Sequence, residues 1–200
     1  MFKIICVTNR KLCKGDFLEQ IEKIAKAKPD ALILREKDLE TDSYAALAGK
    51  VLGICEKEDV TFIAHNFPAA AIEAGAAHLH LPLSVLEATD TGYMAPFSHS
   101  LGVSCHSLED ADLAMQYQAA YITVGHIFET DCKKDIPPKG LDLIKKITEA
   151  YDMPVYAIGG INEDNIALTK EAGAAGACIM SGFMTAPDPE KLISDLRRKV

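Results

Sequence analysis

The sequence lacks the features of a membrane protein or of a nucleic-acid-binding protein. No apolar run reaches the roughly 18 residues that a membrane span requires. Acidic residues outnumber basic ones, 29 to 21, and the net charge of −8 argues against nucleic acid or a membrane surface as the main partner. A local basic site for a small anion remains compatible with this charge. Met1–Thr8 has no basic start and no signal-peptide cleavage site, so we expect a cytoplasmic protein.

Two motifs of other protein classes are also missing. The six cysteines are scattered, and no pair has the CxxC spacing of a zinc or redox site. We therefore expect most of them to be free thiols that pack as small hydrophobic side chains. No GxGxxG follows the first predicted strand, which disfavours a doubly wound dinucleotide-binding sheet.

Short apolar runs alternate with longer amphipathic segments along the whole chain. The predicted strands are residues 2–7, 31–35, 61–65, 78–81, 100–105, 121–128, 155–158 and 176–180. The predicted helices are residues 17–28, 44–58, 69–74, 108–118, 141–150, 163–172 and 189–199, and residues 84–96 are expected to form only a turn or a small helix. This alternation predicts one α/β domain over residues 1–200, a single-domain (β/α)8 TIM barrel. An open doubly wound sheet is the alternative, because periodicity does not prove closure.

Two of the predicted helices begin with recognisable capping residues. Ser107 precedes Leu-Glu-Asp, and Asn162 precedes Glu-Asp-Asn. A short polar side chain followed by acidic residues in the first turn is typical of a helix N-terminus. We therefore expect helices to start directly after Ser107 and after Asn162.

Glycine and serine residues follow the last two predicted strands. Gly159 and Gly160 follow the seventh strand, and Ser181 and Gly182 follow the eighth. Glycine lets the backbone approach an anion closely, and the N–H groups at a helix start can then donate to it. The loops after strands 7 and 8 commonly bind phosphate in this fold. We predict a phosphate site there; the less favoured alternative is that the glycines merely permit tight turns.

Basic side chains follow the second and the sixth strands. Arg35 and Lys37 are two positions apart at a strand end, so both should point to the same side and could bind a second anionic group. Lys133 and Lys134 lie in the long polar loop of residues 129–139, which could close over the site as a lid.

The histidines differ in what they predict. His78 and His80 share one face of a strand but lack a nearby carboxylate as third metal ligand, so packing or hydrogen bonding is preferred. His126 follows Ile122 and Val124 along one face, at the C-terminal end of the sixth strand. A neutral imidazole there suits proton transfer near pH 7. A buried core histidine is the equal alternative.

Taken together, the residues resemble the thiamine phosphate synthase superfamily, and most closely its thiazole tautomerase branch, over nearly the whole chain. The motifs that carry the resemblance are Leu34-Arg-Glu-Lys, His80-Leu, Gly102-Val-Ser-Cys-His-Ser, Gly125-His-Ile-Phe-Glu-Thr-Asp-Cys-Lys-Lys, Ala157-Ile-Gly-Gly-Ile and Met180-Ser-Gly. The long stretch from Gly125 is specific to tautomerase-like members. Synthases are similar but usually carry Gly-Pro there, followed by Thr-x-Thr-Lys.

The chain departs from the synthases where they bind Mg²⁺ and a pyrimidine diphosphate. Synthases have Asn-Asp after strand 3 and an acidic residue after strand 4. Here the positions are Asn66, Phe67 and Ser84, so both metal carboxylates are missing. A synthase-type glutamine is replaced by Ile33. We therefore expect no metal site and no cofactor, with Mg²⁺ required only if the synthase alternative holds.

The resemblance implies an isomerase, a thiazole tautomerase of thiamin biosynthesis that aromatises a carboxythiazole phosphate by metal-independent proton transfer. His126 would be the catalytic acid and base, and Gly159, Gly160, Ser181 and Gly182 would bind the phosphate. Other substrate-binding roles would fall to Arg35, Lys37, Asn66, Ser104, Thr130 and Lys133, whereas Cys132 is given no catalytic role. The partner is then a small phosphorylated thiazole, and whether the chain forms a homo-oligomer stays open. The alternatives are a Mg²⁺-dependent transferase, thiamine phosphate synthase, and a non-catalytic phosphate-ligand-binding regulator on the same barrel.

Overall fold

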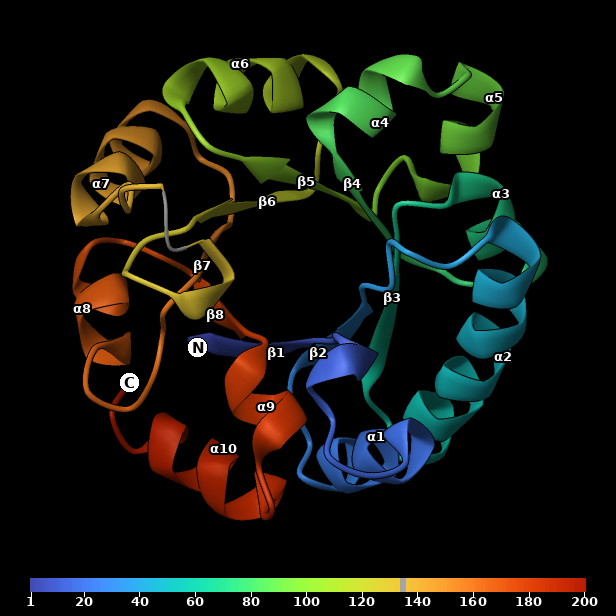
Figure 1. The fold of residues 1–200 in the computed structure, drawn as a ribbon. Coiled ribbons are helices and arrows are strands. Elements are labelled where there is room, and N and C mark those ends of the chain that lie inside the picture. The colour runs from blue at the N-terminus through green and yellow to red at the C-terminus, as the bar shows by residue number, and fades with distance from the viewer. Residues whose placement is uncertain (134–135) are drawn as a thin grey trace.

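The computed structural model describes residues 1–133 and 136–200, apart from the side chains of Thr91 and Cys132. Lys134, one of the two lysines predicted to cover the site, lies outside the described residues, and so does the side chain of Cys132. The described part contains eight strands, all parallel, and they close into a barrel in chain order (Figure 1). They are β1 (Lys3–Val7), β2 (Ala31–Leu34), β3 (Thr61–His65), β4 (Leu79–Pro82), β5 (Leu101–Cys105), β6 (Tyr121–Gly125), β7 (Val155–Ile158) and β8 (Gly176–Ile179). The predicted (β/α)8 barrel is confirmed, because β1 pairs with β8 as well as with β2.

A ring of helices surrounds the barrel (Figure 1). The helices are α1 (Phe17–Lys26), α2 (Thr41–Lys57), α3 (Pro68–Glu73), α4 (Leu83–Ala88), α5 (Thr91–Met94), α6 (Leu108–Gln116), α7 (Leu141–Ala150), α8 (Ile166–Glu171), α9 (Ser181–Thr185) and α10 (Pro189–Arg197). Single 3-10 turns occur at Arg10–Leu12, Ala95–Phe97 and Asp131–Lys133. The fourth crossover, expected to be a turn or a small helix, contains the short α4 and α5.

Each strand is apolar on both faces because each face packs against protein. On β1, Ile4 and Cys6 belong to the layer between strands and helices, whereas Ile5 and Val7 point into the barrel. The same alternation on β6 sends Ile122 and Val124 outward and Tyr121 inward. This two-sided burial explains the nearly continuous apolar strand sequences.

The predicted helix starts are only partly correct. The Ser107 side chain accepts a hydrogen bond from the Asp110 N–H at 3.1 Å, as expected of the cap of α6. The eighth helix instead starts at Ile166, three residues later than predicted, with Asn165 in the capping position. The Asn165 side chain accepts from the Asn162 N–H at 2.9 Å, so a polar turn occupies the predicted first turn.

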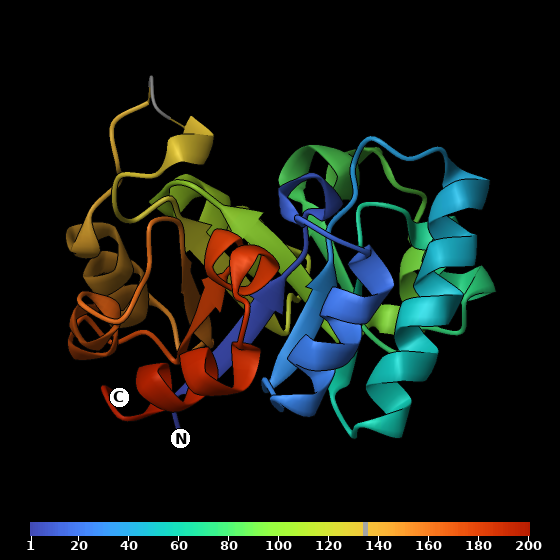
Figure 2. The same ribbon diagram turned by 60° about the horizontal axis from the view of Figure 1, so that its bottom comes forward.

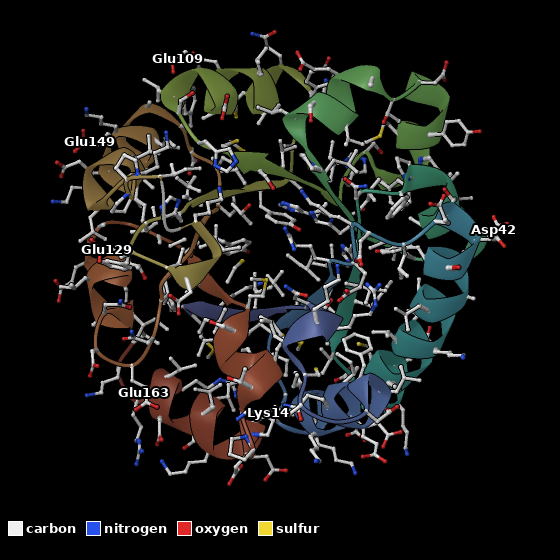
Figure 3. The ribbon with its side chains drawn as sticks, in the orientation of Figure 1. Lys14, Asp42, Glu109, Glu129, Glu149 and Glu163 are labelled. Atoms are coloured by element: carbon white, nitrogen blue, oxygen red, sulfur yellow. The ribbon has the colours of Figure 1, made fainter. Side chains whose placement is uncertain are left out.

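The loops that follow the strands lie together at one end of the barrel. The loop after β6 rises above this end, while both termini lie at the opposite end (Figure 2). Charged side chains such as Asp42, Glu109 and Glu149 lie on the outside of the helix ring (Figure 3). Among the described residues, no helix is both long enough and apolar enough to cross a membrane.

Candidate active site

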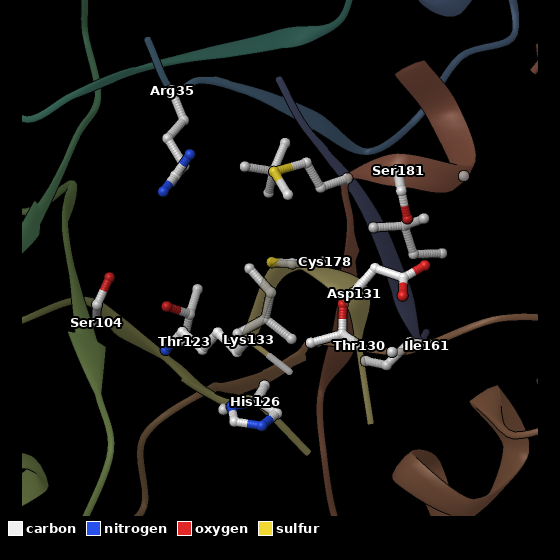
Figure 4. A pocket seen from close by; sticks show the side chains of 18 of the residues that line it. Arg35, Ser104, Thr123, His126, Thr130, Asp131, Lys133, Ile161, Cys178 and Ser181 are labelled. Atoms are coloured by element: carbon white, nitrogen blue, oxygen red, sulfur yellow. The ribbon is translucent and has the colours of Figure 1, made fainter. Parts of the chain in front are cut away.

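A cavity of about 1250 Å³ opens at the C-terminal ends of the strands. Figure 4 shows Arg35, Ser104, Thr123, His126 and Ser181 around this space. The predicted site residues that line it are Arg35, Lys37, Ser104, His126, Thr130, Lys133, Gly159, Gly160, Ser181 and Gly182. Asn66 does not line it; this residue follows β3 with a φ of +71°. The structure thus brings together residues from the loops after β2, β6, β7 and β8, and Ser104 from the end of β5.

The wall at β7 and β8 is built mainly from the main chain. Gly159 and Gly160 have φ values of +99° and +69°, which favour glycine. A Cβ atom at Gly159 would overlap with the His126 side chain, and one at Gly160 would overlap with the loop after β6. Phe128 N–H donates to the Gly159 carbonyl at 3.0 Å, which joins the two loops. The glycines therefore allow close loop packing as well as an exposed backbone.

Ser181 and Gly182 form the first turn of α9, a helix that the sequence analysis did not anticipate. Both residues line the cavity. In barrels of this kind, the loops after strands 7 and 8 and the start of a short extra helix commonly provide main-chain N–H groups for a phosphate. The wall at β7 and β8 consists of the same elements: the loops after both strands and the first turn of the short helix α9.

His126 lies in the cavity wall and is 4% exposed. The reason for this position differs from the predicted one. Ile122 and Val124 point outward to the helices, so a continued strand would have turned His126 outward too. β6 instead ends at Gly125, so the strand alternation does not extend to His126. The prediction that strand 6 runs to residue 128 is therefore wrong, and so is the argument that His126 shares its side with Ile122 and Val124.

The surroundings of His126 define which of its nitrogens can act as a base. Nε2 lies 3.1 Å from the carbonyl oxygen of Ile136. A carbonyl only accepts hydrogen bonds, so Nε2 carries the proton in the neutral ring and Nδ1 holds the lone pair. Lys139 N–H donates to the His126 carbonyl at 2.8 Å, and His106 Nδ1 donates to the Gly125 carbonyl at 2.6 Å. The main chain on both sides of the imidazole is thus held by hydrogen bonds.

Basic side chains also line the cavity, from the segment after β2 and from the loop after β6. Arg35, Lys37 and Lys133 all line the cavity. Burial lowers the pKa of Lys37 from its ordinary value, and the positive charges of Arg35 and Lys133 lower it further. A cluster of positive charges that lowers the pKa of Lys37 favours an anionic ligand.

A buried hydrogen-bond network fixes the backbone that carries Arg35. Arg35 N–H donates to Thr8 Oγ1 at 2.9 Å, and the Thr8 hydroxyl donates to Glu36 at 2.7 Å. The Glu36 carboxylate, 2% exposed, also accepts from the main chain and the guanidinium of Arg10. Glu36 therefore faces away from the cavity, while its neighbours Arg35 and Lys37 face into it.

Sequence reasoning did not select a set of polar residues on the barrel interior. His65 and His80 line the cavity with Thr123, and the two imidazoles stack with centroids 5.6 Å apart. Burial, with a contribution from Lys37, lowers the pKa of His80 to about 3. His80 was expected to pack or to form hydrogen bonds, and it does both. His65 and Thr123 could have been selected from the alternation of each strand, which turns every second side chain into the barrel.

The positions that would carry metal carboxylates do not fit Mg²⁺. Phe67 packs its ring on Tyr44, with centroids 4.6 Å apart, and Ser84 is exposed on α4 outside the cavity. The acidic residues that line the cavity, Glu129 and Asp131, both belong to the loop after β6. Within residues 1–133 and 136–200, no three His, Cys, Asp or Glu side chains converge as a metal site.

Comparison with known proteins gives consistent matches over nearly the whole chain. The sequence model of a family described as thiamine monophosphate synthase matches residues 4–183. The chain is 31% identical over 195 residues to the thiamine-phosphate synthase of Fusobacterium nucleatum, covering 97% of this chain and 95% of that protein. It is 34% identical over 187 residues to the putative thiamine-phosphate synthase 2 of Aquifex aeolicus, covering 91% and 97%. The solved thiamine phosphate pyrophosphorylase of Pyrococcus furiosus superposes with a TM-score of 0.83 at 25% identity, covering 99% and 95%.

Proposed function

The chain belongs to the thiamine monophosphate synthase family, and on that premise we propose that it is a thiazole tautomerase, an isomerase of thiamin biosynthesis. Family membership supports an enzyme of this pathway that acts on small phosphorylated substrates. The finer assignment depends on His126, an imidazole in the wall of the cavity whose Nε2 faces the Ile136 carbonyl, so that Nδ1 holds the lone pair in the neutral ring. The substrate would be a carboxythiazole phosphate with an exocyclic double bond, and the product the aromatic thiazole.

The reaction requires one proton to be removed and one to be added. His126 Nδ1 takes the proton from the ring carbon between nitrogen and sulfur, beside the carboxylate. The electron pair moves into the ring as the exocyclic double bond shifts, and the imidazolium returns a proton to the exocyclic carbon. Aromatisation supplies the driving force. Such acid–base catalysis by one side chain contributes roughly 10²–10⁴-fold.

The two walls of the cavity suit the two anionic ends of this substrate. The main-chain groups of Gly159 and Gly160, with Ser181 and Gly182, would hold the phosphate. Arg35, Lys37 and Ser104 on the other side would hold the carboxylate. Lys133 and Thr130, on the loop after β6, would cover the bound molecule. The substrate would then lie across the cavity, with its ring beside His126.

A divalent metal does not fit this site, and the proposed reaction uses none. Position 67 carries an apolar ring and position 84 an exposed hydroxyl, so neither provides a carboxylate. Mg²⁺ normally requires one or two carboxylates together with substrate phosphates. The cavity has acidic side chains only on the loop after β6 within the described residues. No step is therefore assigned to a metal or to a cofactor.

The alternative is thiamine phosphate synthase, a transferase that couples hydroxymethylpyrimidine diphosphate to thiazole phosphate. The names of the curated relatives favour it. The cavity volume of about 1250 Å³ also exceeds the 300–1,000 Å³ of most small-ligand pockets and has room for two substrates. The test is product formation from the two substrates with Mg²⁺. The residues at positions 67 and 84 predict no coupling.

A single assay tests the tautomerase directly. The carboxythiazole phosphate tautomer is incubated with the protein in D₂O without metal, and NMR follows deuterium at the exocyclic carbon. We expect His126→Asn to lower turnover roughly 10²–10⁴-fold while phosphate-ligand affinity stays within about twofold. Metal-free wild-type protein that leaves the tautomer unchanged would contradict the proposal. Ligand binding without turnover in the wild type would indicate a regulator on the same barrel.

A further inference from the structure

We propose that His80 is a positioning residue that makes the Ser104 and Thr123 hydroxyls hydrogen-bond donors toward the carboxylate of the ligand. The inference rests on the proposed function, because it specifies how that site recognises its substrate. His80 Nε2 lies 2.9 Å from Ser104 Oγ and 3.3 Å from Thr123 Oγ1, while Nδ1 lies 3.2 Å from the Tyr121 hydroxyl. Both Ser104 and Thr123 line the cavity.

The strand register brings these groups together. His80 lies beside Gly102, and Gly102 lies beside Tyr121 on the next strand. A Cβ atom at position 102 would overlap with the Tyr121 ring, so glycine opens the space in which Tyr121 reaches across β5 to His80. Ser104 and Thr123 are paired one level nearer the cavity mouth. The arrangement is therefore built by the barrel itself and not by a mobile loop.

The direction of each hydrogen bond follows from the donors available. The Tyr121 hydroxyl is buried, its pKa is raised well above the ordinary value by burial, and it keeps its proton. Within the described residues, this hydroxyl has no hydrogen-bond partner besides His80 Nδ1. Its proton therefore points to Nδ1, and Nδ1 accepts.

A neutral imidazole has one N–H group, and Tyr121 leaves that group on Nε2. The lowered pKa of His80, about 3, keeps the ring neutral. Ser104 and Thr123 must then accept from Nε2–H, which leaves the hydrogen of each hydroxyl free. The free hydrogens can point into the cavity, where Arg35 and Lys37 already provide positive charge. Two aligned donors beside two cations discriminate a carboxylate from an uncharged substituent.

The test compares two ligands that differ in one group: the aromatic carboxythiazole phosphate and the same thiazole phosphate without its carboxylate. Calorimetry measures both affinities for the wild type and for Tyr121→Phe. Removing the phenol lets the His80 proton move to Nδ1, so that Ser104 donates inward to Nε2 and no longer outward. We expect affinity for the carboxylated ligand to fall about tenfold, and affinity for the other ligand to change less than twofold.

Tyr156→Phe is the matched control. Its ring lies 5.2 Å from that of Tyr121 inside the same barrel, and Tyr156 does not line the cavity. The control should leave both affinities unchanged. Equal losses for both ligands in Tyr121→Phe would show a merely structural role and would overturn the proposal, as would no loss at all. In a Ser104→Ala, Thr123→Val background, the Tyr121→Phe change should have no further effect on carboxylate discrimination.

A second measurement does not depend on any substrate. Long-range ¹H–¹⁵N NMR of the free wild-type protein distinguishes the two neutral forms of His80. We expect a proton on Nε2 and none on Nδ1, and a shift toward the Nδ1–H form in Tyr121→Phe. A wild-type proton on Nδ1 would overturn the inference even if Tyr121→Phe failed to fold. If neither thiazole binds, the proposed function fails, whereas this spectrum still tests His80.

Discussion

The two walls of the cavity differ in the chemical groups that they present to a ligand. Residues from β7, β8 and the loops after them present glycine backbone and uncharged side chains, such as Gly159, Gly160 and Ser181. The wall from β2 to β6 presents side chains whose charge or hydrogen-bond direction depends on their neighbours, such as Lys37 and His80. Stability and affinity that depend on the main-chain wall should be insensitive to pH but sensitive to added atoms. Stability and affinity that depend on the side-chain wall should change when its side chains are protonated or deprotonated.

The largest effect is expected from an added methyl group on the main-chain wall. Gly159→Ala places a Cβ atom against His126 at a φ of +99°, where an L-residue is strained. Backbone strain and overpacking together should lower the free energy of unfolding by about 2–6 kcal/mol. Urea denaturation measures this change, and phosphate-ligand affinity should fall as well.

Gly53→Ala is the control for that substitution. Gly53 is exposed in the middle of α2, and a Cβ atom there meets nothing within 4 Å. The change should stabilise the protein by about 0.5–1 kcal/mol, because alanine favours helix more than glycine does. Similar effects at the two glycines would contradict the close loop packing described for Gly159.

A smaller loss of stability is expected at acidic pH, through protonation of His80 on the side-chain wall. The His80 pKa is about 3 in the folded protein and 6.5 in its ordinary state. The unfolded chain therefore binds the extra proton first as the pH falls below 6.5, so stability is lost in that range. His80 alone should make unfolding about 2 kcal/mol easier at pH 5 than at pH 7. Denaturation at both pH values measures this, and His80→Gln should remove that part of the acid loss.

The smallest effect concerns the clustered cations. Lys37→Met should weaken binding of the carboxylated thiazole phosphate about three- to tenfold, because one of the charges facing the anion is lost. Wild-type affinity should also fall on the alkaline side, since the lowered pKa of Lys37 makes it lose its charge earlier than an ordinary lysine. Calorimetry across the pH range measures both effects. Lys50→Met, on the exposed face of α2, should leave affinity unchanged, and equal weakening by both variants would indicate only a general charge effect.

Strand periodicity and the loop residues predicted the barrel and the side on which most of the site would form. This worked for Arg35 and Lys37 because the strand alternation continues past the end of β2, with Glu36 turned to Thr8. The same reasoning placed Gly159 in the cavity wall, where glycine is required because two loops touch, whereas its phosphate-binding role stays a prediction. Local pattern was sufficient wherever the regular strand geometry held.

The sequence could not show what depends on contacts between distant segments. The direction of His126 is set where β6 stops, and alternation assigned it to the wrong face. The role of His80 depends on Tyr121, two strands away, and on the empty space at Gly102. Helix α9 is only five residues long, too short for a helical period to show.

The network of Thr8, Glu36 and Arg10 has a consequence for binding affinity. It links the segments after β1 and β2 and holds the Arg35 main chain through a 2.9 Å hydrogen bond, and all of its donors and acceptors belong to the chain itself. The conformational entropy of this backbone is therefore lost when the barrel folds and not when an anion arrives. Such preorganisation leaves more of the electrostatic attraction available as net affinity.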